Sequence, residues 1–509
     1  MIPRDGLQES LWQDTAPATT SRRAAPSNKQ YDVAIVGAGI TGCSTAYELA
    51  KAGLECLLIE ARNIGFGTTG GTTAHLNTIL DHTYPEIIQH FDEGTALQLA
   101  TALGRALKRV DENVKQLGLA GIHTWKDALL FSQDKKQTSM LEEIHDATLK
   151  AGVMVSWNDA LPIERTYEKV LRIAGQAQIH PLRYIIALTE EFQRMGGTLL
   201  EGCRMTGYDG GDIITIHTSA GEFKAKNIIH ATHIPMGINL LHFRCAPYRS
   251  YALAARTHDN MPLQELIYDM EDPYHYYRSQ QIDGRDLLII GGEDHKTGHS
   301  EDHMEHLRRL TDHARNVFNI SEVTHRWSSQ YFETTDGLPY IGTLPGHGDN
   351  VQVATGFSGN GITLGVVASL AFTDRLVHGN NELTSLFDPK RVSPVAGFTD
   401  FVKENADVVG HMLSKPFLYQ DLSSLNDLPL DQGKLVDLDG RKVGIYKDRN
   451  GDAHVIDPVC PHAKCTVKWN DAERTWDCPC HGSRFNMDGS LLTGPSTHDL
   501  RRMEPPSEK

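Results

Sequence analysis

The stretch Tyr31-Asp-Val-Ala-Ile-Val-Gly37-Ala-Gly39-Ile-Thr-Gly42 joins an apolar run to a turn with three spaced glycines. The run from Tyr31 to Val36 predicts a buried strand, and a helical pattern follows the turn as far as Ala52. A second apolar segment, Leu54 to Glu60, predicts the next strand. Together these segments predict a βαβ unit at the start of an α/β, Rossmann-like domain.

The glycine spacing predicts a dinucleotide site. Gly37 permits the tight turn, Gly39 lets the backbone approach a pyrophosphate, and Gly42 lets the helix pack closely on the strand. The helix N-terminus then faces the phosphates, because its free amide groups attract anions. Glu60 ends the second strand, where its carboxylate is placed to accept hydrogen bonds from a ribose diol.

Further segments extend this pattern along the chain. They are Glu60-Ala-Arg62, Gly67 to Thr73, Ile228 to Thr232, Asp336-Gly-Leu-Pro-Tyr-Ile-Gly342 and Ala354-Thr-Gly-Phe-Ser-Gly-Asn-Gly361. With them, residues 31–390 resemble the superfamily of D-amino acid oxidase, glycine oxidase and sarcosine oxidase. The resemblance implies FAD as the dinucleotide and hydride transfer from a carbon beside nitrogen, so we expect an FAD-dependent oxidoreductase.

The resemblance also implies which residues bind FAD. It places Arg62 near the adenosine ribose, Met205 at the adenine, and the helix start at Gly356 to Thr363 against the pyrimidine end of the flavin. The full expected set is Gly37, Gly39, Gly42, Glu60, Arg62, Thr72, Thr73, His75, Met205, Gly356, Gly359, Gly361, Ile362 and Thr363.

His75 resembles the histidine to which dimethylglycine-type dehydrogenases attach FAD, but Ala74 replaces the family's tryptophan. We favour a packing or hydrogen-bonding role for His75 over a covalent link.

The substrate site departs from the family pattern. Amino acid oxidising relatives hold the substrate carboxylate with an arginine where this chain reads Gln330-Tyr-Phe-Glu333. Candidate catalytic residues are Tyr277, Arg278 and Tyr331, and Arg278 or Arg249 is a substitute carboxylate clamp. Tyr251 and Tyr276 are candidates for the pocket wall, although aromatic residues in strands also fill ordinary cores. No residue stands out as a general base.

A second motif lies near the C-terminus, where half of the eight cysteines occur between Cys460 and Cys480. Cys460-Pro-His462 is followed by Cys478-Pro-Cys480-His481-Gly-Ser483. Two thiolates and two imidazoles, from Cys460, His462, Cys478 and His481, suit a Rieske [2Fe-2S] cluster. The alternative is a structural zinc ion with the same four ligands.

Residues 416–505 resemble Rieske proteins of the cytochrome bc type. The resemblance implies a disulfide between Cys465 and Cys480, a hydrogen bond from Ser483 to a cluster sulfur, and a shielding loop at Gly494-Pro495. Phe485 replaces the family's tyrosine. The loss of that hydroxyl donor predicts a reduction potential below that of the respiratory type.

The expected domain organisation has four parts. These are an N-terminal arm, mobile or packed along the surface (1–30), the oxidoreductase (31–395), a linker (396–415) and a small all-β Rieske domain (416–509). FAD-binding segments are expected at about 31–84, 181–240 and 331–390, and an inserted α+β substrate domain at about 85–180 and 241–330. The histidines His295, His303 and His306 are expected on a solvated helical face.

Composition excludes some functions. A formal net charge of -16 with no basic tract disfavours a nucleic-acid partner. No apolar run reaches the roughly 20 residues of a membrane span, so we expect a cytoplasmic protein without an integral membrane segment.

We expect an amine or amino-acid-like small molecule to reduce FAD, with the cluster relaying electrons to an external carrier. The alternatives are an oxygen-using oxidase with a structural Rieske domain, or an electron-transfer module with little substrate oxidation of its own.

Overall fold

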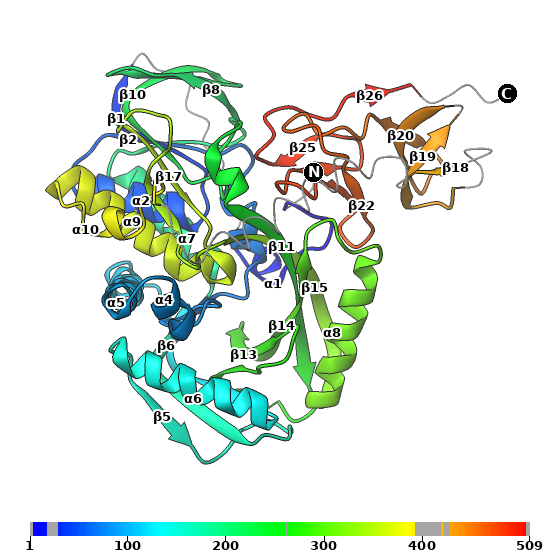
Figure 1. Ribbon diagram of the computed structural model, residues 1–509. Coiled ribbons are helices and arrows are strands. Elements are labelled where there is room, and N and C mark those ends of the chain that lie inside the picture. Colours follow the sequence, from blue (N-terminus) through cyan, green and yellow to red (C-terminus); the bar gives the residue numbers. More distant parts are fainter. Residues whose placement is uncertain are drawn as a thin grey trace.

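A computed structural model describes residues 4–17, 29–260, 262–391, 419–421, 428–438 and 440–504 (Figure 1). The predicted linker 396–415 lies outside the described residues. The chain forms two large sheets with covering helices, and the small β domain sits beside them near the N-terminus. The predicted combination of a flavoprotein α/β fold with a small all-β domain is confirmed.

The first sheet contains the predicted βαβ unit. Its strand order is β16-β17-β10-β1-β2-β7, with β9 on β10 and β8 on β9. The strands are β1 (Gln30–Val36), β2 (Cys56–Ile59), β7 (Thr198–Leu200), β8 (Met205–Asp209), β9 (Ile214–Thr218), β10 (Gly221–His230), β16 (Tyr340–Thr343) and β17 (Val351–Thr355). Its central pairings are parallel. Parallel strands are covered on both faces, which explains the continuous apolar run before Gly37.

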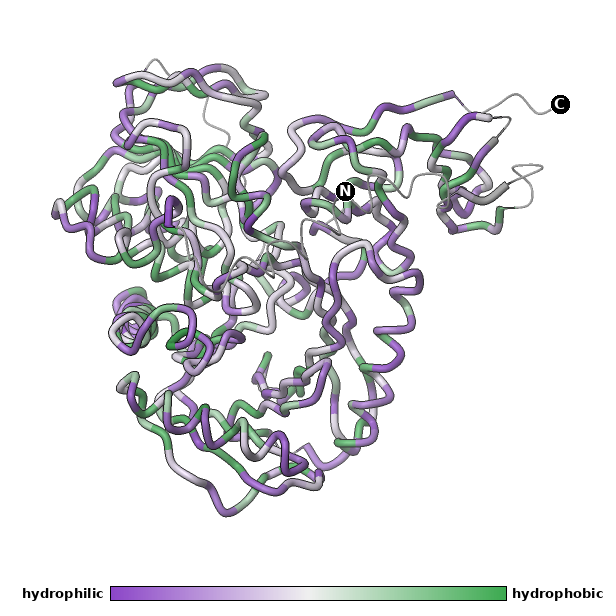
Figure 2. The backbone as a smooth tube through the Cα atoms, viewed as in Figure 1, coloured by the Kyte–Doolittle hydropathy of each residue, from purple (hydrophilic) through white to green (hydrophobic). Residues whose placement is uncertain are grey.

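Three helices accompany this sheet, and α2 packs between the other two. They are α2 (Ile40–Lys51), α7 (Pro181–Arg194) and α9 (Gly361–His378). The sheet region is rich in hydrophobic residues in Figure 2, whereas α8 (His303–Val317), at the outer edge, is largely hydrophilic.

The second sheet has the order β15-β11-β14-β13-β12-β4-β6-β3, with β5 on β6. Its strands are β3 (His75–Leu76), β4 (His123–Ser132), β5 (Val155–Asn158), β6 (Lys169–Ile179), β11 (Cys245–Thr257), β12 (Leu266–Tyr268), β13 (His275–Ile282), β14 (Arg285–Lys296) and β15 (Ile320–Thr334). Helix α8 packs on β11 and β14, and α6 (Lys135–Lys150) packs on β4 and on α4 (Tyr84–His90). Helix α5 (Glu93–Gln116) contacts α9 and so joins the two sheet regions.

The C-terminal domain is built from two small sheets. One has the order β18-β19-β20-β21-β26 and the other β22-β23-β24-β25. Their strands are β18 (Gln420–Asp421), β19 (Gln432–Leu438), β20 (Arg441–Lys447), β21 (Ala453–Ile456), β22 (Lys468–Asn470), β23 (Thr475–Asp477), β24 (Arg484–Asn486), β25 (Leu491–Thr493) and β26 (Arg502–Met503).

The shorter helices are α1 (Leu11–Asp14), α3 (Thr68–Gly71) and α10 (Glu382–Leu386), with 3-10 turns η1 (Leu240–Phe243) and η2 (Ser358–Asn360). Within the described residues, no helix is long and apolar enough to cross a membrane. The cytoplasmic location stays a prediction.

The described part of the N-terminal arm, residues 4–17, inserts several side chains into the interior instead of lying only along the surface. Arg4, Leu11 and Trp12 are fully buried. Ser10 caps α1 and donates to the Gly70 carbonyl oxygen, and the Trp12 indole donates to the Thr72 carbonyl oxygen. Its mixed polar composition suggested exposure, because the sequence alone does not show which charges find partners in the interior.

Candidate flavin and iron-sulfur sites

A cavity of about 790 Å³ extends from the Gly37–Gly39 turn to the second sheet. Residues from both sheets line it, together with Leu492, Thr493, Gly494 and Ser496 of the C-terminal domain. The Arg62 and Arg204 guanidinium groups donate to the Leu491 carbonyl oxygen at 2.8 and 3.0 Å, which seats that domain against the cavity. This participation of the C-terminal domain in the cavity wall was not foreseen from the sequence.

The glycine turn has the close approaches that the motif predicts. Gly37 has a φ of +103°, and a Cβ there would lie 2.4 Å from the Ala231 carbonyl oxygen. A Cβ on Gly42 would lie 1.8 Å from the Gly37 carbonyl oxygen. Helix α2 begins after Gly39, and its Ile40 amide donates to the Thr69 hydroxyl at 3.0 Å. Gly39, Ile40 and Thr41 line the cavity, so the positive end of the helix dipole would attract an anion there. Glu60 lines the cavity and accepts from the amides of Ala38 and Arg62, each at 2.8 Å.

Most of the residues expected to bind FAD line this one cavity. They are Gly37, Gly39, Glu60, Arg62, Thr72, Thr73, His75, Met205, Gly359, Gly361, Ile362 and Thr363. Gly42 and Gly356 lie behind the wall. A Cβ on Gly356, where φ is +73°, would meet the Thr334 methyl group at 2.3 Å. Gly42 and Gly356 therefore shape the backbone, and the remaining residues form a cradle that fits FAD.

His75 lies in the cavity wall as a neutral imidazole. Its Nδ1 is 2.8 Å from the Tyr268 hydroxyl, and its buried Nε2 has no hydrogen-bond partner within the described part of the chain. Burial, with the nearby charge of Arg278, lowers the pKa of His75 well below its usual value. The contact with Tyr268 agrees with the hydrogen-bonding role expected for His75.

Two of the three candidate catalytic residues lie outside the cavity wall. Tyr277 faces α8, where its hydroxyl is 2.7 Å from His313 Nε2. Arg278 is fully buried and donates to the carbonyl oxygens of Thr73 and Ala74 at 2.8 and 2.7 Å. Neither lines the cavity. Side chains alternate along β13, so Tyr277 points away from the face that Tyr276 presents to the cavity. Arg278 shares the face of Tyr276, but its guanidinium group is held by the backbone of Thr73 and Ala74.

Arg249 is not a carboxylate clamp either. It is fully buried, and it pairs with Asp477 of the C-terminal domain at 3.1 Å. The expected solvated histidines are also differently placed. His303 is buried and contacts Asp471 of the C-terminal domain at 3.1 Å, and His295 stacks on His306 with ring centroids 4.3 Å apart.

Tyr331 lines the cavity, and it contacts Asp294, a residue that no sequence motif had indicated. Its hydroxyl donates to Asp294 Oδ2 at 2.9 Å, and Asp294 also lines the cavity. Tyr276, predicted as a pocket residue, lies beside them with its hydroxyl 3.0 Å from Ser250 Oγ. The sequence holds one indirect signal for Asp294, namely that side chains alternate along β14 and Asp294 falls on the face turned to the cavity.

The C-terminal motif brings its four predicted ligands together. The His462 and His481 rings have centroids 4.9 Å apart. A hydrogen bond between the two thiols lowers the pKa of Cys460 and raises that of Cys478. The Nδ1 atoms of both histidines are buried and lack a hydrogen-bond partner among the described residues. Two adjacent buried thiols and two buried imidazole nitrogens without partners are the donor set that a Rieske cluster requires.

The residues around the motif also match the resemblance. Cys465 and Cys480 form a disulfide with a sulfur–sulfur distance of 1.98 Å. Ser483 is fully buried, hydrogen-bonds Cys460, and accepts from the Ser496 amide at 2.9 Å. This contact ties the second motif loop to the segment that follows Gly494-Pro495.

The predicted ligand histidines lie against the oxidoreductase rather than in solvent. His462 Nε2 is 3.0 Å from the carbonyl oxygen of Gly237. The rings of His242 and His462 meet edge to face with centroids 4.6 Å apart, and Phe243 lies 5.9 Å from His481. The turn η1 and the loop before it therefore cover the histidine side of the motif.

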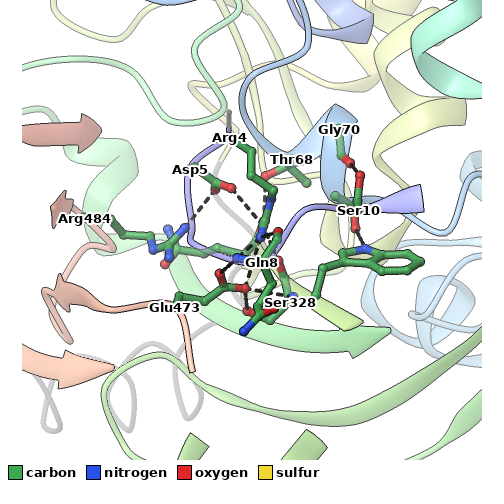
Figure 3. A network of polar contacts seen from close by, with 12 residues as sticks. Arg4, Asp5, Gln8, Ser10, Thr68, Gly70, Ser328, Glu473 and Arg484 are labelled. Atoms are coloured by element: carbon green, nitrogen blue, oxygen red, sulfur yellow. Dashed lines mark hydrogen bonds and ion pairs between the residues drawn. The ribbon is translucent and has the colours of Figure 1, made fainter. Parts of the chain in front are cut away.

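A buried ion network holds the two domains together with the N-terminal segment (Figure 3). Arg4 pairs with Glu473 at 3.1 Å and also donates to the Ser328 carbonyl oxygen, while Asp5 pairs with Arg484 at 2.8 Å. Asp477 joins it through the Arg249 pair and through Arg484 at 3.1 Å. The set has three cations, Arg4, Arg249 and Arg484, and three anions, Asp5, Glu473 and Asp477, all at most 2 % exposed.

Burial alone would raise the pKa of these carboxylates, but the surrounding guanidinium groups lower it by more. The pKa of Glu473 is lowered by Arg4, Arg484 and Arg249, and that of Asp477 is lowered further by Arg484 and Arg249. Glu473 and Asp477 are therefore ionised at neutral pH, where each faces guanidinium groups.

Comparison with known proteins agrees with this geometry. The family model for FAD dependent oxidoreductases matches residues 32–375, and that for the Rieske [2Fe-2S] domain matches residues 419–504. Glycine oxidase from Geobacillus kaustophilus has a similar fold, with a TM-score of 0.60 at 19% identity over 71% of this chain and 99% of its own.

Two curated proteins are similar in sequence. One, named as a Rieske 2Fe-2S iron-sulfur protein, YhfW of Bacillus subtilis, is 32% identical over 97% of both chains. Gamma-glutamylputrescine oxidoreductase of Escherichia coli is 24% identical over 70% of this chain and 85% of its own. The chain therefore belongs to the FAD dependent oxidoreductase family and carries a C-terminal Rieske domain, with FAD and a [2Fe-2S] cluster as its cofactors.

Proposed function

We propose that this enzyme oxidises an amine or amino-acid-like substrate and passes the electrons from FAD through the Rieske cluster to an external one-electron carrier. The contact between His462 and the Gly237 carbonyl oxygen, at 3.0 Å, carries this proposal. The loop that contains Gly237 also contributes His233 and Met236 to the cavity wall. One short segment thus touches both the cavity expected to hold FAD and a ligand of the cluster.

The two cofactors have complementary electron capacities. FAD accepts two electrons as a hydride, and a [2Fe-2S] cluster exchanges one electron at a time. The protein's contribution is to hold the two sites at a fixed separation. Gln330 donates to the Gly482 carbonyl oxygen at 2.9 Å, next to His481, and the buried ion network fixes the opposite side of the interface.

The cavity favours an enzyme over an electron-transfer module alone. It extends past the expected flavin position to Tyr276, Asp294 and α6, leaving a lined space on the substrate side. The names of two similar proteins, glycine oxidase and gamma-glutamylputrescine oxidoreductase, support an amine or amino acid as the reductant.

An anaerobic titration of the purified protein, followed by visible and EPR spectra, tests the relay. With an oxidisable amine, we expect a reduced Rieske signal to appear as the flavin absorbance bleaches. If dithionite reduces the cluster but the amine bleaches only the flavin, the relay is wrong. If metal analysis finds zinc and no iron, the protein is a flavoprotein with a structural C-terminal domain.

A small change at the interface should slow the relay without replacing any residue expected to bind a cofactor. Gly298 has a φ of +76°, and a Cβ there would lie 2.6 Å from the Pro479 side chain. We expect Gly298→Ala to displace the cluster loop and slow cluster reduction severalfold in stopped-flow measurements, with normal flavin reduction.

Gly284→Ala is the matched control, because Gly284 has a φ of +78° at the other end of β14, and a Cβ added there would meet nothing within 4 Å. The two variants share the backbone strain of a left-handed alanine, about 1 kcal/mol. Equal cluster reduction rates in both variants would contradict the fixed docking.

A further inference from the structure

The walls of the cavity differ in charge between its two ends. We define the substrate half by the lining residues of the second sheet, α4, α6 and the loops at Ile79–Thr83 and Asp269–Tyr274. Its lining carboxylates are Asp81, Glu86, Asp269, Glu271, Asp272 and Asp294. Among the described residues, no lysine or arginine lines this half. The two lining arginines, Arg62 and Arg204, lie at the other end beside Glu60 and donate to the Leu491 carbonyl oxygen.

Several of these carboxylates already have structural partners. Asp81 accepts from the Gly359 amide at 2.6 Å, Glu86 accepts from the Thr83 amide at 2.7 Å, Asp269 pairs with His275 at 3.0 Å, and Glu271 pairs with Arg165 at 2.5 Å. These contacts hold loops and the start of a helix in place. The four carboxylates therefore have structural roles that do not require a ligand in the cavity.

Asp294 is different. Its Oδ2 accepts the Tyr331 hydroxyl at 2.9 Å, while its Oδ1 is buried with no hydrogen-bond partner within the described residues. The Ser250 hydroxyl lies 3.0 Å from the Tyr276 hydroxyl and also faces Asp294, whose pKa it lowers. A buried carboxylate oxygen without a donor costs free energy, and a donor from a ligand in the cavity would remove that cost.

We propose that the substrate is a cationic amine with no carboxylate beside its reacting carbon, and that Asp294, oriented by Tyr331, binds its ammonium group. This inference rests on the proposed amine oxidation and names its substrate class. A substrate carboxylate would meet carboxylates and no guanidinium group in this half of the cavity. Amino acids are therefore excluded by charge repulsion and by the absence of a bidentate partner.

Asp294 also provides a destination for the substrate proton. The ammonium first gives one proton to the Asp294 carboxylate, which leaves the nitrogen lone pair free. FAD bound in this cavity would accept the hydrogen of the adjacent C–H bond as a hydride, together with the electron pair of that bond, while the nitrogen lone pair forms the C=N bond of an iminium product. The step would balance as two electrons and one hydrogen to FAD and one proton on Asp294.

The protonation behaviour of Asp294 suits this role. Burial raises its pKa to about 7, against hydrogen bonds that lower it. The groups that face it are Tyr331 on β15, Tyr274, His275 and Tyr276 at the start of β13, and Asp81 after β3. Because the carboxyl group loses its proton as pH rises through about 7, cation binding should strengthen over that range.

Calorimetric binding of n-butylamine, butyrate and 2-aminobutyrate to the oxidised holoprotein tests the substrate class. The three probes share a four-carbon chain and differ in charge. We expect n-butylamine to bind at least about tenfold more tightly than either carboxylate, a difference of about 1.4 kcal/mol. Equal or tighter binding of 2-aminobutyrate would overturn the proposal.

Asp294→Asn tests the residue, because the amide has the same shape and no charge. We expect it to weaken n-butylamine binding about tenfold or more and to remove the rise of affinity through pH 7. Glu271→Gln is the matched control in the same cavity, and its effect should be much smaller because Arg165 already neutralises Glu271. Equal losses of n-butylamine affinity in the two variants would show that the overall negative charge of the cavity attracts the amine. That result would contradict a specific ammonium site at Asp294.

Tyr331→Phe keeps the test informative if Asp294→Asn folds poorly. Loss of the hydroxyl donor should shift the midpoint of the pH dependence upward, since the charged carboxylate loses a hydrogen bond. If the midpoint of the pH dependence does not shift, the hydrogen bond from Tyr331 does not set the protonation of Asp294, and the proposed role of the two residues is wrong. These measurements report affinity for the oxidised protein and do not depend on electron transfer to the cluster, so a failed relay with intact amine selectivity would overturn only the proposed function.

Discussion

Replacing Cys478 with alanine should abolish the Rieske EPR signal and the reduction of a one-electron acceptor, while amine-dependent bleaching of the flavin continues. Cys478 is fully buried and hydrogen-bonds Cys460, and its sulfur lies within 4.8 Å of both disulfide sulfurs. A Rieske cluster needs both thiolates on one iron, so the loss of one leaves no site of the same type. Stopped-flow flavin reduction and steady-state ferricyanide reduction separate the two half-reactions.

Cys56→Ala is the matched control for this experiment. Cys56 is also a buried free thiol, but it lies on β2 in the flavin-binding sheet. We expect Cys56→Ala to keep the EPR signal and acceptor reduction, apart from a modest loss of stability. If Cys478→Ala lacks the signal but reduces ferricyanide at the parental rate, electrons leave the flavin directly and the cluster is not on the route.

Motifs whose chemistry is local could be predicted from the sequence. The glycine spacing requires short backbone approaches at Gly37 and Gly42, and the cavity begins at that turn. The same holds for the disulfide between Cys465 and Cys480, which follows from the resemblance to Rieske proteins. In both cases a few neighbouring residues determine the geometry, so distant parts of the chain add little.

The substrate side could not be predicted in the same way, because it depends on which face of a strand turns inward. Tyr276 and Tyr277 are adjacent and chemically alike, yet only Tyr276 lines the cavity. Arg278 and Arg249 were reasonable carboxylate clamps by type, but backbone carbonyl oxygens and Asp477 hold them. Asp294 had no motif around it, and only the pairing of β14 with its neighbours places it beside Tyr331.

The interface between the domains was the least accessible feature. Arg4 and Glu473 are separated by 469 positions in the chain, and no local pattern links them. The N-terminal residues have the composition of a solvated arm, but they carry charges that complement those of the C-terminal domain. A charged segment is therefore compatible with burial when each charge has a partner of opposite sign.

Replacing Arg484 with methionine should be strongly destabilising. Arg484 is fully buried and contacts Asp5 at 2.8 Å and Asp477 at 3.1 Å, so its removal leaves two buried carboxylates with less compensation. Breaking a buried pair by removing one partner costs about 3–5 kcal/mol, because the remaining charge stays buried. Methionine has a similar length and keeps most of the apolar contact, which restricts the change mainly to charge and hydrogen bonding.

Arg501→Met is the matched control in the same domain. Arg501 is 72 % exposed and pairs with Asp457 at 3.1 Å, and exposed pairs contribute less than about 1 kcal/mol. Denaturant unfolding followed by the visible absorbance of the cluster should report the loss in the C-terminal domain. Similar midpoints for the two variants would show that the network does not stabilise the docked domain. A large loss for Arg484→Met alone, with earlier release of the C-terminal domain, would show that the N-terminal segment and both domains fold as one cooperative unit.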